Sequence, residues 1–181
     1  MSPQLNHPSR SQDELRVVVD AQIVLAMFLA RRDRPGLVSP KRQLLGLLTE
    51  PKFRWLWSSD IINDYERGAD AIEADNRIMR RAEFDGVGFQ LFLAALQLQP
   101  PVAVSMATMS NARRRISQAP RSAERDLEDA VYLACAVDGR AQLLTTEDSD
   151  LRLLGDSYED VRIINWRELK REFLRRGLAI D

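Results

Sequence analysis

The sequence predicts a single α/β domain, a three-layer α/β/α arrangement around a central parallel sheet of about five strands. Short apolar runs rich in β-branched residues alternate along the chain with longer helical patterns, as in parallel sheets covered on both faces. The chain has 181 residues, enough for one domain with a substantial core. No repeat, linker or low-complexity segment divides it, so we expect one domain over residues 15–181.

Five segments have the pattern of buried strands. The first contains the β-branched run Arg16-Val-Val-Val and ends at Asp20. In the second, Phe53, Trp55 and Trp57 alternate with other residues at the two-residue period of a strand. The predicted strands are residues 16–19, 53–57, 102–105, 141–145 and 160–164.

Helical patterns fill most of the remaining chain. Ser39 and Ser122 are suited to cap helices, and Gly139 is suited to end one in a left-handed conformation. The polar, arginine-rich residues 106–121 favour a solvated loop instead. The predicted helices are residues 21–31, 39–48, a segment starting near residue 60, 69–82, 86–98, 123–138 and 166–176.

Composition excludes several kinds of site. Cys135 is the one cysteine and His7 the one histidine, which argues against a cysteine-based zinc site and against Ser–His or Cys–His catalysis. Cys135 lies in an apolar helical pattern and is expected in the core. The formal net charge is −1, so any nucleic-acid binding must come from local basic patches.

The N-terminal segment and the apolar runs predict no membrane association. Residues 1–14 are polar and lack the apolar centre of a signal peptide, so we expect a disordered leader. The apolar runs are too short and too interrupted to span a bilayer. Together with the low cysteine content, this predicts a cytoplasmic protein.

Aspartates gather where the predicted strands give way to helices. Because parallel strands present their carboxyl ends at one edge of a sheet, side chains that follow them should meet there. Asp126 and Asp129 are three residues apart and share one face of their predicted helix. The acids concerned are Asp20, Asp64, Asp126, Asp129, Asp148 and Asp150.

Several carboxylates in one pocket predict a bound cation. Mutual repulsion would raise their pKa values unless a cation neutralised them. Oxygen ligands select hard cations such as Mg²⁺ or Mn²⁺, and these ions acidify bound water and stabilise charge at a phosphoryl centre. Hydrolysis of a phosphodiester bond is the reaction class that this chemistry favours.

Three segments resemble the PIN-domain family over about residues 16–164. VVVDAQIVLAMF resembles the first-strand motif of PIN domains, and IINDYERGAD resembles the helix that carries their second acid. DLEDAVYLACAVDGRAQLLTTEDSDL resembles the block in which an aspartate-bearing helix leads to a strand ending in Thr-x-Asp, and it is the most specific of the three.

The resemblance implies a function and a set of site residues. PIN domains are metal-dependent ribonucleases, and many are toxins paired with an antitoxin protein. Four positions correspond to the metal-binding acids, Thr146 to the hydroxyl that orients the last loop, and Asp126 and Asp150 to outer members of the site. The four acids are Asp20, Asp64, Asp129 and Asp148.

Two positions depart from the family pattern. The family usually has Asp-Thr-Asn at the first site, where this chain has Asp20-Ala21-Gln22. The second acid is usually glutamate, and Asp64 is one methylene shorter; Glu66 faces elsewhere on the helix. These departures favour an alternative in which a PIN-like domain has lost catalysis and binds RNA or protein.

Other α/β classes fit less well. A haloacid-dehalogenase-like phosphatase requires a second aspartate two residues after Asp20, and that position is Gln22. A dinucleotide-binding fold requires a glycine-rich turn after the first strand, which is absent. Each aspartate taken alone also has an ordinary structural role, as a helix cap, a turn residue or a solvated side chain.

Two further groups have both a structural and a functional interpretation. The arginines Arg113, Arg114, Arg115 and Arg121 belong to a solvated segment or hold RNA phosphates beside the acids. The apolar residues Leu91, Phe92, Leu93, Leu96 and Leu98 belong to the core or to the face of a homodimer.

Overall fold

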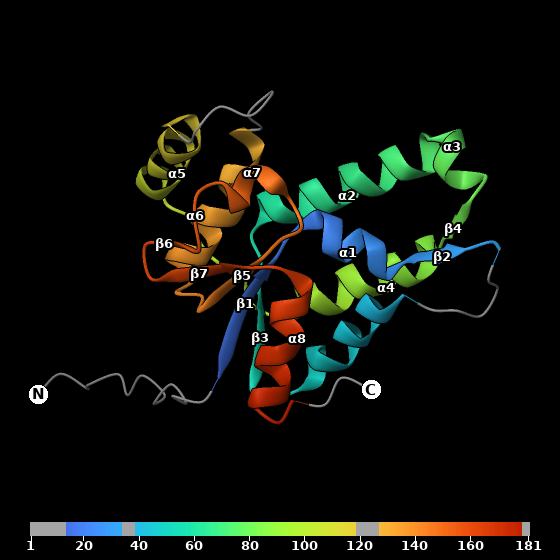
Figure 1. The fold of residues 1–181 in the computed structure, drawn as a ribbon, viewed down its shortest axis with the longest axis horizontal. Helices are drawn as coiled ribbons and strands as arrows, with labels where there is room; N and C mark the ends of the chain where they lie inside the picture. Colours follow the sequence, from blue (N-terminus) through green and yellow to red (C-terminus); the bar gives the residue numbers. More distant parts are fainter. Residues whose placement is uncertain (1–13, 34–38, 119–126, 179–181) are drawn as a thin grey trace, which may run out of the picture.

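A computed structural model describes residues 14–33, 39–118 and 127–178 (Figure 1). Residues 1–13, which make up nearly all of the predicted leader, lie outside the described residues. Within the described part, no helix is long and apolar enough to cross a membrane.

The main sheet is mostly parallel, as the sequence predicts. The first four strands of the order β3-β1-β5-β7-β6 run parallel, and the short edge strand β6 pairs antiparallel with β7. The strands are β3 (Phe53–Leu56), β1 (Leu15–Val19), β5 (Leu143–Thr145), β7 (Val161–Ile164) and β6 (Ser157–Tyr158). The central strands are almost wholly buried, which explains their continuous apolar sequences.

Helices flank this sheet (Figure 1). The apolar helix α6 packs on β1 and β5, and Phe173 of α8 packs edge-on against Phe53 of β3 at 5.8 Å between ring centres. The helices are α1 (Ala21–Met27), the 3₁₀ helix η1 (Pro40–Thr49), α2 (Ser59–Ala74), α3 (Asn76–Met79), α4 (Gly86–Gln97), α5 (Met106–Gln118), η2 (Leu127–Asp129), α6 (Ala130–Asp138), α7 (Ser149–Arg152) and α8 (Trp166–Arg175).

A second, two-stranded sheet corrects two helix predictions. Strands β2 (Leu29–Arg31) and β4 (Ala82–Phe84) pair antiparallel where helices were predicted to continue. The physical reason is packing around Phe28, whose ring contacts Phe84 and Phe89, so the chain leaves α1 in extended form. Tertiary contacts override local helical preference here.

The region after α4 also differs from the prediction. Residues 102–105 form no strand, although the Val102 amide donates to the Trp57 carbonyl at 2.7 Å. The arginine-rich segment predicted as a loop forms α5, because Met109, Ala112 and Ile116 recur at helical spacing and are buried.

The ends of α6 differ in detail from the prediction. The predicted cap Ser122 lies outside the described residues, and α6 follows the short helix η2. Gly139 ends α6 with a φ of −72°, so it is not left-handed; Arg140 is, with a φ of 52°. Glycine is needed for space instead, because an added Cβ would lie 2.6 Å from the Cys135 carbonyl oxygen.

Candidate active site

The carboxyl ends of β1 and β5 bring Asp20, Thr146 and Asp148 together. Asp20 directly follows β1, and its amide donates to the Thr145 carbonyl at 3.0 Å, so the two neighbouring strands fix its position. The side chain of Asp20 is buried, with 4% of the residue exposed. Thr146 is fully buried and Asp148 half-buried, and both follow β5 at the carboxyl edge of the sheet.

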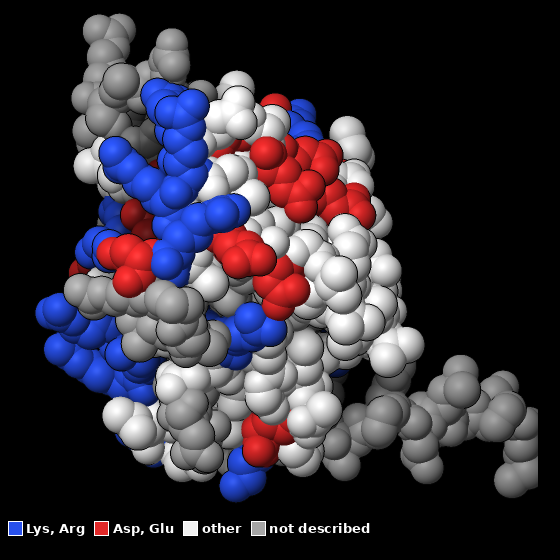
Figure 2. Space-filling view, turned by 90° about the vertical axis from the view of Figure 1, so that its right-hand side faces the viewer, with Lys and Arg blue, Asp and Glu red and all other residues white. Residues whose placement is uncertain are grey.

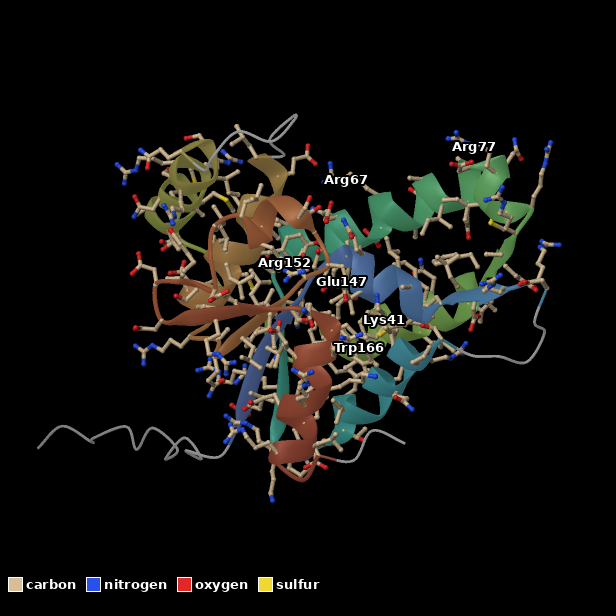
Figure 3. The ribbon with its side chains drawn as sticks, in the orientation of Figure 1. Lys41, Arg67, Arg77, Glu147, Arg152 and Trp166 are labelled. Carbon is tan, nitrogen blue, oxygen red and sulfur yellow. The ribbon has the colours of Figure 1, made fainter. Side chains whose placement is uncertain are left out.

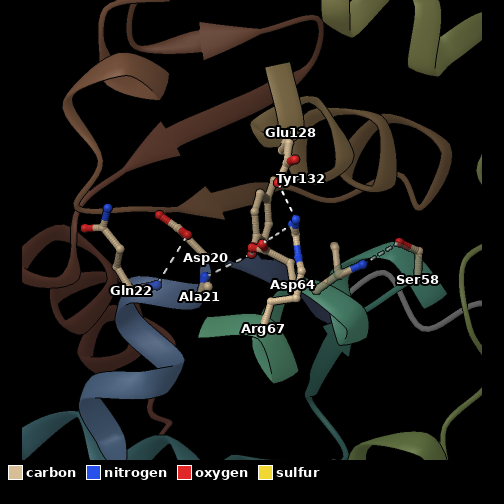
Figure 4. Close-up of polar contacts among 9 residues, drawn as sticks. Asp20, Ala21, Gln22, Ser58, Asp64, Arg67, Glu128 and Tyr132 are labelled. Carbon is tan, nitrogen blue, oxygen red and sulfur yellow. Dashed lines mark hydrogen bonds and ion pairs between the residues drawn. The ribbon is translucent and has the colours of Figure 1, made fainter. Parts of the chain in front are cut away.

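Hydrogen bonds orient both oxygens of Asp20. The Thr146 hydroxyl donates to Asp20 Oδ2 at 2.5 Å. The Gln22 amide donates to Asp20 Oδ1 at 3.4 Å as a cap of α1 (Figure 4). The same Thr146 oxygen accepts from the Asp148 amide at 2.8 Å. Thr146 therefore connects the loop after β5 to the acid after β1, the role that the resemblance assigns to it.

Asp20 lies in an environment that disfavours its charge. Burial raises its pKa from the usual 3.8 to about 6, and the negative charges of Asp148 and Asp64 add to the increase. The bonds from Thr146 and Gln22 lower the pKa and offset part of this effect. A buried acid with acidic neighbours is the electrostatic setting in which a cation would bind favourably.

Asp64 is held from two sides. It lies on α2, whose start is capped by the Ser58 side chain accepting from the Ile61 amide (Figure 4). The Tyr132 hydroxyl donates to Asp64 Oδ2, and Arg67 donates to Oδ1 at 2.8 Å. Arg67 also pairs with Glu128 at 2.6 Å, so one guanidinium bridges α2 and η2.

Tyr132 connects Asp64 to the first site. Its hydroxyl accepts from the Ala21 amide at 3.2 Å while it donates to Asp64. Burial, together with nearby acids, raises the pKa of this phenol well above 10, so the hydroxyl keeps its proton and remains a donor. Beneath it, the buried Tyr65 hydroxyl donates to the Val19 carbonyl and ties α2 to β1.

Comparison with known proteins places the chain in a family. The family described as PIN domain matches residues 16–150, which include the three segments that carry the resemblance except for the last residue, Leu151. The chain belongs to the PIN-domain family. PIN domains are generally nucleases and typically use divalent metals.

A solved structure supports this PIN fold. The crystal structure of PAE2754 from Pyrobaculum aerophilum superposes with a TM-score of 0.51 over 92% of this chain and 99% of that chain, at 11% identity. At this identity the likeness concerns the fold alone. No curated protein matches the sequence significantly.

In this PIN domain the departure at Gln22 has a structural role. The longer amide reaches across the site, and Gln22 Nε2 donates to Asp148 Oδ2 at 3.0 Å. Gln22 thereby touches Asp20 through its backbone and Asp148 through its side chain. The hydroxyl and the short amide that usually follow the first acid in the family are replaced here by Ala21 and Gln22. The Thr146 hydroxyl supports Asp20 instead.

The remaining predicted acids are described less fully. Asp129 is half-buried, ends η2 and precedes α6, three residues before Tyr132. Asp126 lies outside the described residues, and for Asp150 only its place in α7 is described.

The fit to a metal ion depends on how these acids are arranged. Among the described residues, no group of three or more His, Cys, Asp or Glu is close enough to hold an ion. The donors are of the right chemical kind, since carboxylate oxygens suit Mg²⁺ and Mn²⁺. Asp64 is already neutralised by Arg67, so it must exchange that partner to join Asp20 and Asp148 around a cation.

Three of the four predicted RNA-contacting arginines lie on α5. Arg113, Arg114 and Arg115 are exposed; Arg114 binds Asn111, and Arg115 donates to the Leu154 carbonyl at 3.1 Å. Arg121 lies outside the described residues.

A second basic group surrounds the β2–β4 sheet, and the sequence prediction missed it. The Arg32 amide donates to the Arg81 carbonyl at 3.0 Å, so strand pairing brings two arginine pairs together. Figure 2 views this end of the molecule and shows basic side chains with acidic ones beside them; Arg31 pairs with Asp33 and Arg77 with Asp75. The exposed arginines here are Arg31, Arg32, Arg77, Arg80 and Arg81, which we call the distal arginine group.

Arg67, Glu128 and Tyr132 were also missed. A signal existed, because Arg67 follows Asp64 by three residues and Tyr132 follows Asp129 by three, the spacing of neighbours on one helix face. Which neighbours meet across two helices depends on how the helices are rotated, and spacing along one chain segment does not determine that.

The prediction for Cys135 is confirmed. It is fully buried, and burial raises the pKa of its thiol to about 12. The leucine-rich surface of α4 is divided: Phe92, Leu93 and Leu96 are buried, whereas Leu91 and Leu98 are 67% and 88% exposed.

Proposed function

We propose that this PIN domain is a Mg²⁺- or Mn²⁺-dependent endoribonuclease. The observation that carries the proposal is Asp20, an oriented carboxylate buried at the carboxyl edge of the sheet, whose pKa is raised by burial and by Asp148 and Asp64. Family membership supports hydrolysis of a phosphodiester bond as the chemistry.

The acids have distinct parts in this proposal. Asp20 and Asp148 would hold the cation, together with Asp64 and Asp129 from α2 and η2. Bound there, the cation would supply stabilisation of negative charge at the phosphate and a more acidic water. Thr146 and Gln22 keep the carboxylates of Asp20 and Asp148 oriented, which lowers the cost of assembling the site.

Residues around the acids would orient Asp64 and contact the phosphates of the substrate. Tyr132 keeps its proton and holds one Asp64 oxygen, leaving the other to Arg67. If Asp64 turned to a cation, the Arg67 guanidinium would keep its pair with Glu128, and the nitrogen that now contacts Asp64 could pair with a phosphate. Arginines of α5 and of the distal arginine group would hold the strand by its phosphates.

The deciding experiment is cleavage of labelled RNAs and single-stranded DNA with Mg²⁺, with Mn²⁺ and with chelator. Wild type should cut RNA with metal only, and Asp20→Asn and Asp129→Asn should each lose at least about a hundredfold in rate. Glu83→Gln, at an exposed acid on β4, is the matched control and should cut normally. A folded wild type that cuts nothing in either metal contradicts the proposal.

The geometry also gives a reason to consider a PIN domain that binds without cutting. Asp64 is neutralised by Arg67, and Asp148 is occupied by the Gln22 amide. Restoring the usual pattern with Ala21→Thr and Gln22→Asn discriminates between the two functions. Cleavage that appears only in the double variant supports the binding module, and cleavage already present in wild type excludes it.

A cytoplasmic toxin with an antitoxin protein as partner is a further proposal that rests on the resemblance. Growth arrest on expression of wild type but not of Asp20→Asn would support it.

We also propose a homodimer through α4, where Val87, Leu91 and Leu98 expose apolar side chains. Sedimentation of wild type and Leu91→Glu tests this contact.

A further inference from the structure

A cavity of about 640 Å³ opens at the amino edge of the sheet, opposite the acids. It is formed where α6 ends, where β5 and β7 begin and where α8 ends, so none of its lining residues belongs to the candidate active site. Its volume is that of a small-molecule site. Val137, Ala141, Leu143 and Val161 give it an apolar wall.

Four arginines from three parts of the fold line this cavity. Arg140 follows α6, Arg162 lies on β7, and Arg175 and Arg176 end α8. The guanidinium groups of Arg140 and Arg162 have no ion-pair partner within the described residues. Two charged groups are therefore available to a ligand.

The other two arginines are fixed in place by one acid. Glu172 is almost buried and accepts from Arg175 at 2.5 Å and from Arg176 at 2.7 Å. Because this pairing orients both guanidiniums, little conformational entropy is lost when a ligand binds them. With the exposed acids Glu159 and Asp160, the lining contains four arginines and three acids, an excess of one positive charge.

The backbone around the cavity is strained. Arg140 and Glu159 have φ values of 52° and 51°, and they are the two non-glycine residues with positive φ in the described part of the chain. Both line this cavity. Glycine would adopt this conformation without strain, so an arginine at position 140 points to a use for its guanidinium group.

We propose that this cavity binds a small organic phosphate monoester. Guanidinium groups recognise a phosphate through paired, charge-assisted hydrogen bonds, and convergence from three elements suits its tetrahedral oxygens. The apolar wall and the volume leave room for an organic body beyond the phosphate. The site is independent of the proposed nuclease activity.

Titration calorimetry with adenosine 5′-monophosphate, inorganic phosphate and adenosine tests this proposal. The full chain carrying Asp20→Asn is used in the presence of a chelator, so that the candidate active site contributes nothing. The monophosphate should bind at one site, inorganic phosphate should compete with it at higher concentration, and adenosine should not bind. No binding of the monophosphate, or equal binding of adenosine, overturns the proposal.

Two glycine substitutions separate ligand binding from folding. Arg140→Gly should weaken monophosphate binding by roughly tenfold or more. Its melting temperature should stay equal or rise by about 1–4 °C, because glycine relieves the positive φ. Glu159→Gly relieves the same strain but removes a repelling charge, so it should bind at least as tightly as the parent. Unchanged affinity in both Arg140→Gly and Arg162→Ala overturns the assignment to this cavity.

Discussion

Asp20 and Glu172 are two poorly exposed acids at opposite edges of one sheet, and their pKa values move in opposite directions. Burial among other acids raises the pKa of Asp20 to about 6. Hydrogen bonds from Arg175 and then Arg176 lower the pKa of Glu172 to about 2, against the effect of burial. Glu172 is neutralised by two arginines of the protein itself, whereas the negative charge at Asp20 is left for a bound cation or a proton to neutralise.

Among substitutions that leave the acids of the Asp20 edge in place, Thr146→Val should have the largest effect on cleavage. The substitution removes the hydroxyl that donates to Asp20 and accepts from the Asp148 amide, so cleavage should fall about 10- to 100-fold. Rates of RNA cleavage at saturating Mn²⁺ provide the measurement.

Two neighbouring variants control for folding and shape. Thr145→Val is buried on the same strand, and its hydroxyl has no hydrogen-bond partner among the described residues, so activity should be unchanged. Thr146→Ser keeps the hydroxyl and should retain most activity. Equal losses in Thr145→Val and Thr146→Val would show that packing, not the hydroxyl, is what matters.

Asp20→Asn should change how the free energy of unfolding depends on pH, in the direction set by the raised pKa of Asp20. A carboxyl whose folded pKa is about 6 contributes stability below its unfolded pKa near 3.8 and loses it as pH rises through 6. The wild type should therefore be less stable than the variant at pH 7 by about 2–3 kcal/mol, and nearly equal at pH 4. Urea unfolding in chelator between pH 4 and 8 measures this, and a pH-independent difference contradicts it.

Glu172→Gln should show the opposite pH dependence. A folded pKa of about 2 against the usual 4.5 gives stability above pH 4.5 that is lost as pH falls towards 2. After allowance for the exposed Arg175, the variant should lose about 1 kcal/mol at pH 7 and approach wild type only near pH 2. Denaturant unfolding measures it, with Glu66→Gln on the exposed surface of α2 as control.

Arg67→Gln should have the smallest effect. It removes the cation that competes with metal for Asp64, so Mn²⁺ affinity should rise about two- to fivefold. Figure 3 shows Arg67 on α2 and Arg77 on α3, beyond the far end of α2, so Arg77→Gln is a distant control. Titration calorimetry with Mn²⁺ decides, and weaker binding in Arg67→Gln would falsify the idea of competition.

The fold was predictable where a segment's own pattern sufficed. β1, α6 and α8 have continuous or strongly periodic apolar sequences, and these elements form. Residues 102–105 have the composition of a strand but form none, although Val102 bonds to Trp57 just after β3, and α5 is polar except for three buried positions. Local composition did not reveal the neighbours that decided both cases.

The candidate site was predictable in its position and less so in its contacts. Parallel strands place Asp20, Thr146 and Asp148 at one edge whatever the details of packing. The contacts of Tyr132 and Arg67 depend on the rotation of α2 and α6, and no residue pattern specifies it. The positive φ of Arg140 was missed because sequence logic assigns such a conformation to the adjacent Gly139.

The strand order has a consequence for synthesis. Strand β1 lies between β3 and β5, and the contacts of Asp20 with Thr146 and of Gln22 with Asp148 each join residues 126 positions apart. Contacts this distant in sequence form late in folding, and during translation they must wait for the residues of β5 and the loop after it. A growing chain on the ribosome, surrounded by RNA, therefore has no assembled acidic centre until Thr146 and Asp148 have been synthesised.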